Sequence, residues 1–324
     1  MKGGCGIMGI KRVYLLMICL LPYYIFCQAT EEQSKLTGTD IDLVGELIVF
    51  DGQLGSLSVH RHDDYIYRDI YFDTPDFDLY NSGYSLRIRS RYFNADSIVY
   101  AIQLKSEMTN ISAVRMEVEE ADLDIYTISN GETRLPLTTL LNRLFQSVDT
   151  STNFIKTNLN KQDVALLHQW MIFKSESTIT PFQTLHAIFP DDKNLIDRLQ
   201  PVTFGSEYRS RCHLYISIDS LNEKDLIVQP LSQEEVPIFF NEHPEYIWVA
   251  EGSYDEAQFI SLLTPNDRAI SIVEFEIENK LKPETTGTAL IEACKSDLIK
   301  DHRLSIEYRS KYRQAVEGLG LAGN

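Results

Sequence analysis

Three arginines alternate within a short segment of this chain. Arg87, Arg89 and Arg91 stand at every second position of the stretch SLRIRSR, with Leu86 and Ile88 among the residues between them. Residues two apart on a β-strand project from the same face. A guanidinium group can donate two parallel hydrogen bonds to phosphate oxygens. The spacing therefore predicts a basic strand face that is suited to a phosphate-rich anion.

Further strand-like segments carry charges of mainly one sign at the same spacing. They hold Gln103 and Lys105, then Arg115 with Glu117 and Glu119, then Arg209 and Arg211 in parity with Asp219, then Glu274, Glu276 and Glu278. A solvated outer face is the simpler interpretation, because antiparallel sheets commonly keep one face wet. Segregation by sign favours a polar interior instead. Basic strands would bind a polyanion there, and acidic strands would hold Mg²⁺ or Mn²⁺.

The elements that must position these residues come in blocks, with strands first, then helices, then strands again and a final helix. Strand-like text runs from about residue 43 to 120, helical spacing follows from 135 to 200, strands resume at 203–219 and 269–280, and 286–301 is an amphipathic helix. This order does not fit a doubly wound parallel sheet. It predicts an α+β fold, a mostly antiparallel barrel or sandwich with helices packed outside.

Composition narrows the function class. The chain of 324 residues carries 47 acidic against 30 basic residues, a formal net charge of -17. So acidic a balance argues against a general nucleic-acid binder, although it leaves a basic interior open. No Cys-x-x-Cys pair occurs, which excludes a zinc–thiolate site. No phosphate-cradling glycine loop is legible either.

The N-terminal residues have the pattern of a leader. Lys2, Lys11 and Arg12 precede the apolar run VYLLMICLLPYYIF, and a polar stretch follows Ala29. This pattern predicts a signal peptide over residues 1–29 and a secreted or periplasmic protein, with an uncleaved membrane anchor as the alternative. Cys212 and Cys294 would remain in the mature chain, and the sequence leaves their pairing open.

The stretch YFDTPDFDLYNSGYSLRIR resembles the triphosphate tunnel metalloenzymes, also called CYTH proteins. Further matches to the family pattern fall on Lys105, on the Arg115–Glu119 strand, on Arg209, Arg211 and Asp219, on Glu274 and Glu276, and on Lys311 with Tyr312. YRSKY and RIRSRYFNADSIVYAIQLKS also resemble the polyphosphate-polymerase domain of the vacuolar transporter chaperone family. The resemblance spans roughly residues 43 to 316.

The resemblance implies a closed antiparallel eight-stranded β-barrel with helices packed outside. It also implies a Mg²⁺- or Mn²⁺-dependent phosphohydrolase that acts on inorganic triphosphate or a nucleoside triphosphate inside a basic tunnel, and the predicted signal peptide implies that this enzyme is exported. Its ligand would be a triphosphate or polyphosphate, with no nucleic acid and no stable membrane span after signal cleavage. The tunnel domain would cover 43–316 with a helical insertion at about 135–200, after a linker at 30–42 and before a tail at 317–324. The implied roles are catalysis by Glu117 and Glu119, metal binding by Asp219, Glu274 and Glu276, and phosphate binding by Arg87, Arg89, Lys105, Arg115, Arg209, Arg211 and Lys311.

One segment departs from the family pattern. The family opens with a strand that carries acids at alternate positions followed by Lys, whereas LVGELIVF at 43–50 places Ile48 and Phe50 where an acid and Lys would stand. His60, His62 and Asp64 alternate nearby and could serve as metal ligands instead, although an exposed strand end is the simpler interpretation. The alternative function is therefore a non-catalytic polyphosphate-binding module that has lost its first-strand metal ligands.

Overall fold

The computed structural model describes residues 29–94, 97–107, 114–120, 123, 127–130, 133–146, 148–149, 156–157, 160–175, 179–220, 236–263, 268–280 and 286–322. The predicted signal peptide lies almost entirely outside these residues, since only its last residue, Ala29, is described. No helix in the described part of the chain is both long and apolar enough to span a membrane.

The largest sheet holds ten strands, all paired antiparallel. They are β1 (Ala29–Gly38), β2 (Gln53–Leu54), β3 (Leu57–Asp73), β4 (Tyr84–Asn94), β5 (Ser97–Ser106), β6 (Val114–Glu120), β11 (Gln200–Ser217), β12 (Tyr246–Ser261), β13 (Ala269–Asn279) and β14 (Leu304–Ile306). Hydrogen-bonded pairing leads from β3 through β4, β5, β6, β1, β13 and β12 to β11, and β11 in turn pairs with β3. The prediction of an α+β fold with a large antiparallel sheet is confirmed.

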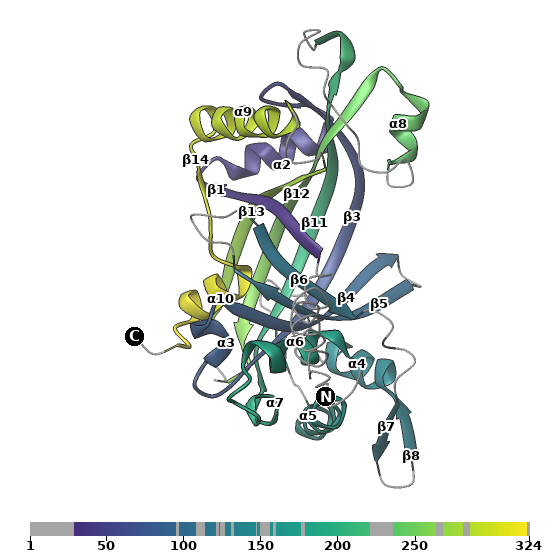
Figure 1. The fold of residues 1–324 in the computed structure, drawn as a ribbon, viewed down its shortest axis with the longest axis vertical. Helices are drawn as coiled ribbons and strands as arrows, with labels where there is room; N and C mark the ends of the chain where they lie inside the picture. The colour runs from purple at the N-terminus through teal and green to yellow at the C-terminus, as the bar shows by residue number, and fades with distance from the viewer. Residues whose placement is uncertain are drawn as a thin grey trace, which may run out of the picture.

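Small strand pairs and helices surround this sheet (Figure 1). The short strands are β7 (Thr127–Asn130) with β8 (Thr133–Pro136), and β9 (Val148–Asp149) with β10 (Lys156–Thr157). The helices are α2 (Ile41–Val49), α3 (Asp78–Asn81), α4 (Leu137–Gln146), α5 (Lys161–Ser175), α6 (Thr180–Ile188), α7 (Leu195–Arg198), α8 (Ile238–Glu242), α9 (Thr286–Asp301) and α10 (Lys311–Leu319), with a 3₁₀ turn at Ile218–Ser220.

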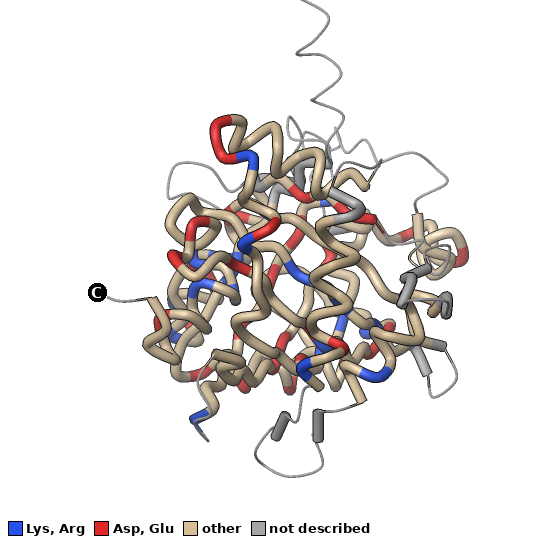
Figure 2. Tube along the Cα trace, turned by 90° about the horizontal axis from the view of Figure 1, so that it is seen from below, with Lys and Arg blue, Asp and Glu red and all other residues tan. Residues whose placement is uncertain are grey.

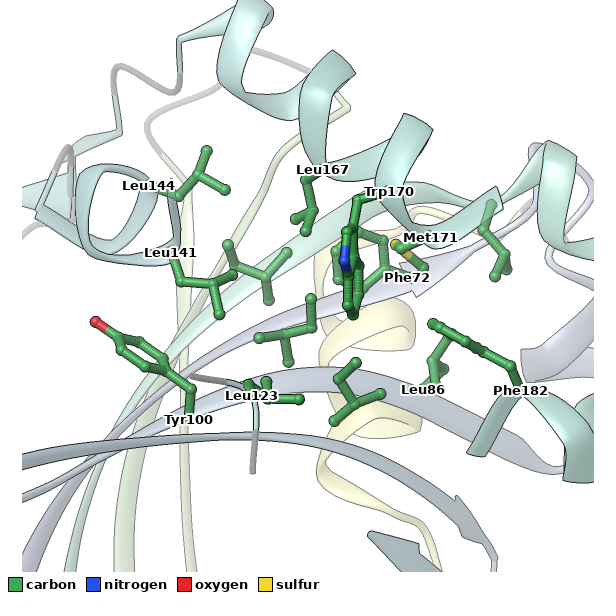
Figure 3. Close-up of a cluster of buried hydrophobic side chains, with 14 of the residues drawn as sticks. Phe72, Leu86, Tyr100, Leu123, Leu141, Leu144, Leu167, Trp170, Met171 and Phe182 are labelled. Carbon is green, nitrogen blue, oxygen red and sulfur yellow. The ribbon is translucent and has the colours of Figure 1, made fainter. Parts of the chain in front are cut away.

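Two of the three apolar cores in the described residues lie between helices and the outer face of the sheet. Helices α4 to α6 pack Leu141, Leu167 and Phe182 over Leu86 and neighbouring strand residues (Figure 3). Helices α2 and α9 cover the other end of the sheet, with residues such as Val44 and Ile291 in the second core. Fully burying an aliphatic side chain contributes about 1.5–3 kcal/mol. These helices therefore hold the strands from outside. A third apolar core, which includes Tyr71, Phe259 and Val316, packs α10 against inward-facing residues of β3 and β12.

The inner face of the sheet is charged and buried. Arg87 and Arg89 are 7% and 5% exposed, whereas Leu86 and Ile88 between them belong to the outer core. Seen from below, basic and acidic residues intermingle within the trace as well as around its rim (Figure 2). The interpretation of these strand faces as solvated outer faces is therefore wrong, because it is the apolar side that faces outward beneath helices.

Residues 43–50 are not a strand. Residues 43–49 belong to helix α2 and Phe50 is its C-cap, and Ile41, Val44, Gly45 and Ile48 are buried at helical spacing. The β-branched content of the segment suggested a strand, but its burial follows the helical period.

The segment 30–42, expected to be a linker, contains most of strand β1. β1 pairs with β6 on one side and β13 on the other. Its sequence, ATEEQSKLTG, has little apolar alternation because Glu32 and Ser34, which alternate with the buried inward-facing Gln33 and Lys35, are polar as well. The helices expected at about 135–200 lie between 137 and 198 in the described residues.

Candidate active site

Strands β3 and β4 supply a hydrogen-bonded cluster around Asp69. Arg89 donates from Nε to Asp69 Oδ1 at 2.7 Å and from a terminal nitrogen to Oδ2 at 2.8 Å. Arg87 donates to the same carboxylate at 3.1 Å, to the Tyr71 hydroxyl at 2.9 Å and to the Gln103 amide oxygen at 2.7 Å. These partners fix the direction of both guanidinium groups.

Strands β11, β12 and β13 bring a second group of charges to the same interior. Arg209 donates to both carboxylate oxygens of Asp255, at 2.6 and 2.5 Å, and to Glu276 at 2.9 Å. Glu207 joins the two groups, because Arg89 lies 3.1 Å and Arg209 3.2 Å from its carboxylate oxygens.

Helix α10 adds Lys311 from the end of the chain. Its Nζ lies 2.5 Å from Asp255 Oδ2, 3.0 Å from Glu274 Oε1 and 3.4 Å from Glu207 Oε1. Strand β1 adds Lys35, whose Nζ is 3.7 Å from Glu274. Lys35 and Lys311 are both buried.

Burial and neighbouring charges shift the acids in different directions. Burial disfavours the ionised form of Glu207, but the charges of Lys311 and Arg89 outweigh it and hold the pKa of Glu207 well below its usual range. Burial instead dominates at Glu274 and raises its pKa despite Lys311 and Lys35. It likewise raises the pKa of Asp255 despite Arg209 and Lys311.

Asp255, Glu274 and Glu276 could hold a metal ion. Each offers one carboxylate oxygen, these oxygens all lie within 4.8 Å of one another, and all three residues are buried. Oxygen ligands of this kind suit the hard cations Mg²⁺ and Mn²⁺. Glu274 Oε1 makes no hydrogen bond among the described residues, although it contacts two lysine ammonium groups. The donor set therefore fits the predicted cofactor.

Two adjoining cavities run along this interior. The first spans about 440 Å³ of space that is partly open to solvent, and it is lined by basic and hydroxyl side chains, among them Lys35, Arg87, Lys105 and Lys311. The second spans about 610 Å³ and is also partly open to solvent. Both cavities are lined by Arg89, Lys105, Arg209 and Glu276.

The structure brings most of the residues singled out from the sequence to these cavities. Arg87, Arg89, Lys105, Arg209, Arg211, Lys311, Glu117, Glu119 and Glu276 line one or both of them, and Glu274 contacts Lys311. Glu117 pairs with Lys105, and Glu119 accepts a hydrogen bond from Gln103. Neither belongs to the group of Asp255, Glu274 and Glu276.

Some of the proposed residues lie elsewhere. Asp219 is exposed in the 3₁₀ turn after β11, so it does not lie with the buried acids. Asp255, rather than Asp219, is the third carboxylate beside Glu274 and Glu276. Arg115 belongs to β6, but its side chain is outside the described residues.

The histidines considered as substitute ligands are also apart from the buried acids. The ring of His62 stacks on His213 at 4.3 Å, and that of His60 stacks on Phe239 at 3.9 Å. Asp64 pairs with Arg61 and accepts a hydrogen bond from Ser210. These contacts make the three residues part of the packing between β3, β11 and α8.

Sequence reasoning missed five interior residues, namely Gln33, Lys35, Asp69, Glu207 and Asp255. Glu207 has a signal in hindsight, because it alternates with Arg209, which was chosen. Asp69 has none of this kind, because it alternates with Tyr67 and Tyr71, which were not chosen. The other three stand on β1 and β12, which were not predicted as strands.

The missed strand β1 changes the expectation about the first family motif. It reads Glu31-x-Gln33-x-Lys35, with Lys35 paired opposite Glu276 and Gln33 opposite Glu278. β1 therefore has the family's arrangement of polar residues at alternate positions followed by Lys, with Gln33 in place of one of the two acids. The apparent loss of this motif at 43–50 came from placing the strand in the wrong segment.

Comparison with known proteins gives one family match. Residues 47–153, about a third of the chain, match the CYTH domain. No curated protein sequence matches the chain. The resemblance to the polyphosphate-polymerase domain has no support from these comparisons.

Three solved structures align with most of this chain, but with low TM-scores and low sequence identity. A proposed adenylyl cyclase from Hippeastrum with a dominant triphosphatase activity has a TM-score of 0.43 and 12% identity, covering 89% of this chain and 95% of that chain. The PH1819 protein of Pyrococcus horikoshii OT3 has a TM-score of 0.38 and 14% identity, covering 89% and 99%. The Mimivirus capping enzyme triphosphatase has a TM-score of 0.27 and 10% identity, covering 87% and 95%.

These scores are too low for the likenesses to support a conclusion about fold or function. The similarity to a known family comes instead from the CYTH domain match, which includes the Asp-Thr-Pro-Asp stretch at 73–76 and the arginines of β4. The match at residues 47–153 is to the CYTH domain, the same family that the sequence motifs resemble.

Proposed function

We propose that this protein is a Mg²⁺- or Mn²⁺-dependent phosphohydrolase that cleaves inorganic triphosphate or a nucleoside triphosphate. The main support is that one interior holds both a candidate metal site and a basic phosphate site. The first is the group of Asp255, Glu274 and Glu276, and the second includes Arg87, Arg89 and Lys311. In this proposal the circuit of eight strands forms a closed barrel, and its lumen is the substrate tunnel. The N-terminal leader exports the protein.

The basic residues of the first cavity would bind and orient the phosphates. Arg87 and Arg89 are held in place by Asp69, Tyr71 and Gln103, so little conformational entropy is lost when a phosphate arrives. Phosphoryl transfer needs mainly positioning and neutralisation of charge. Lys35, Lys105 and Lys311 add further positive charge to the same cavity.

Asp255, Glu274 and Glu276 would hold the metal. A bound Mg²⁺ or Mn²⁺ supplies polarisation of a phosphoryl oxygen and lowers the pKa of a coordinated water. Glu117 and Glu119 line the second cavity, where their carboxylates would orient the attacking water or accept its proton.

Phosphate release from tripolyphosphate by the purified chain tests this proposal. Release should require Mg²⁺ or Mn²⁺, stop with chelator, and be lost in the double variant Glu274→Gln/Glu276→Gln. Glu292→Gln, which changes an exposed residue of α9, is the matched control. Release that persists in the double variant would show that the metal assignment is wrong.

A non-catalytic polyphosphate-binding module is the second candidate, and Gln33 is the observation that favours it. An amide stands there where the family pattern has an acid. This candidate predicts tripolyphosphate binding without phosphate release. The variant Arg87→Ala/Arg89→Ala should lose binding under either candidate.

A further inference from the structure

Lys311 is directed into the acidic cluster by the way α10 is anchored. Ser310 caps the helix by accepting a hydrogen bond from the Arg313 amide. Tyr312 donates to Asp73 at 2.8 Å, and the Arg313 guanidinium contacts Glu107 at 2.7 Å. Contacts on both sides of the residue thus fix the start of the helix, and Lys311 is only 6% exposed.

The Lys311 ammonium lies among the same oxygen atoms that a metal would need. Its Nζ is 2.5 Å from Asp255, 3.0 Å from Glu274 and 3.8 Å from Glu276. These are the three residues of the candidate metal group, whose ligand oxygens lie within 4.8 Å of one another. An ammonium that contacts all three stands where an ion bound by them would stand.

A divalent metal and this ammonium cannot share the position. Mg²⁺ takes oxygen ligands at about 2.0–2.1 Å, and two cations at such short range from the same carboxylates repel each other strongly. We propose that Lys311 is the resident cation of this acidic cluster and that a divalent metal binds only by displacing it. This inference rests on the metal site of the proposed function.

Displacement would also change the phosphate site. The Lys311 side chain remains tethered to α10 beside the first cavity, which Arg87 and Arg89 line as well. A freed ammonium is then available to a phosphate oxygen. Metal and triphosphate therefore favour each other's binding through Lys311, in the reciprocal way that linkage requires.

Direct binding of Mn²⁺, measured from the EPR signal of free Mn²⁺ without substrate, tests the inference. Lys311→Met should bind Mn²⁺ at least about tenfold more tightly than the unmodified chain, a change of about 1.4 kcal/mol. Lys295→Met is the matched control, because Lys295 is similarly buried but contacts Glu292 on α9. Its affinity should match that of the unmodified chain. Equal or weaker Mn²⁺ binding by folded Lys311→Met would overturn the inference.

A labelling experiment on the unmodified chain covers the case in which Lys311→Met does not fold. Acylation of Lys311 by an amine-reactive reagent, followed by peptide mass spectrometry, should increase several-fold at saturating Mn²⁺. Exposed Lys193 serves as the reference and should be labelled equally with and without metal. Unchanged labelling of Lys311 would overturn the inference.

Neither readout requires hydrolysis, so the two proposals can fail separately. A chain that releases no phosphate but shows the affinity change retains the Lys311 inference and loses the proposed function. A chain that releases phosphate with metal but shows neither change retains the function and loses the inference. Absence of Mn²⁺ binding in both the unmodified chain and Lys311→Met would remove both.

Discussion

Arg89 illustrates how this protein keeps charges in a buried interior. Its guanidinium satisfies two carboxylates at once, those of Asp69 and Glu207, while its face lies 4.0 Å from the centre of the Tyr67 ring. Desolvating a charge costs several kcal/mol unless a well-placed partner offsets it. The acids that pair with arginines are therefore as necessary to the site as the arginines are.

Removing Arg89 should destabilise the fold as well as the proposed function. Arg89→Ala leaves Asp69 and Glu207 buried without this partner, and breaking a buried pair costs about 3–5 kcal/mol. Arg143→Ala is the control, because Arg143 pairs with Asp163 while its own side chain is 48% exposed, and such a pair contributes about 0–1 kcal/mol. Urea unfolding of both variants measures the difference, and equal losses would contradict the account of buried pairing.

Replacing Gln33 should have the opposite effect on stability from replacing Arg89. Its amide oxygen is buried without a hydrogen-bond partner among the described residues, and its side chain lines the second cavity. An unsatisfied buried polar atom costs about 1–3 kcal/mol. We expect Gln33→Leu to keep or raise the free energy of unfolding while it lowers phosphate release from tripolyphosphate. A loss of stability in thermal unfolding would show that Gln33 is structural.

The residues of the site were predictable where an alternating pattern marked a strand that the sequence also identified. Arg87, Arg89 and Glu276 were found in this way. Asp69 was not singled out although its strand was predicted, because a single acid among apolar and aromatic residues does not reveal that its partner is Arg89 across the sheet. Pairing of that kind depends on strand register, which a single sequence does not give.

At the scale of elements, Asp73 shows that the most family-specific stretch has a structural task. Its carboxylate accepts hydrogen bonds from the backbone amides of Leu79 and Tyr80, each at 2.9 Å, at the short helix α3. It also accepts a hydrogen bond from the hydroxyl of Tyr312 on α10. One buried carboxylate thus ties the end of β3 to the helix that carries Lys311.

Tyr312→Phe should loosen α10. The substitution removes a hydrogen bond to a charged group, which contributes about 1.5–3 kcal/mol, while it keeps the stacking of the ring on Tyr71. We expect faster amide hydrogen exchange at 311–319 than in the unmodified chain, with little change in α9. A uniform increase across the molecule would instead mean that the hydroxyl supports the whole fold.

Helix α8 packs on histidines, and this contact should make stability depend on pH. Burial, with the neighbouring charges of His62, His60 and Arg211, lowers the pKa of His213 to about 3 from 6.5. Below about pH 6.5 the His213 side chain is protonated in the unfolded chain, whereas in the folded chain it stays neutral down to about pH 3. Stability therefore falls as pH falls through this range, by up to about 1.4 kcal/mol per pH unit from this group.

His213→Phe tests that dependence. The phenyl ring can keep edge contacts with Phe240 and Trp248, which now lie 5.4 and 5.3 Å from the imidazole. The free energy of unfolding from pH 7 to 4 should fall less steeply in the variant. A curve parallel to that of the unmodified chain would assign the acid sensitivity to other groups.

Elements with a clear period were predicted well, and the others were missed for a physical reason. Segment 97–106, chosen as a strand from its alternation, is β5, and 286–301 is α9. β1 and β12 carry small or polar residues, such as Ser34, Ala250 and Gly252, on the face opposite the charged interior, so their sequences lack the clear apolar and polar alternation of β4. In an interior of this kind, a buried strand face is polar, and hydropathy alone cannot identify it.

At the scale of the whole molecule, β1 completes the circuit of strands. It is the shared neighbour of β6 and β13, it buries Leu36 in the core beneath α2 and α9, and it delivers Lys35 to the interior. Without it, β6 and β13 would each present an unpaired edge, which is a site of aggregation. The family match begins only at residue 47, so an N-terminal boundary drawn from that match would omit this strand.

Two shortened chains should therefore differ sharply. A chain that begins at Thr30, the product of the predicted signal cleavage, keeps nearly all of β1 and should unfold cooperatively and bind tripolyphosphate. A chain that begins at Thr39 lacks β1 and should lose both properties, because two strands lose their partner and Glu274 loses Lys35. Thermal unfolding by circular dichroism and tripolyphosphate binding measure this. Equal unfolding midpoints for the two chains would mean that β6 and β13 do not need β1, and that the barrel with its tunnel is not closed in the way proposed.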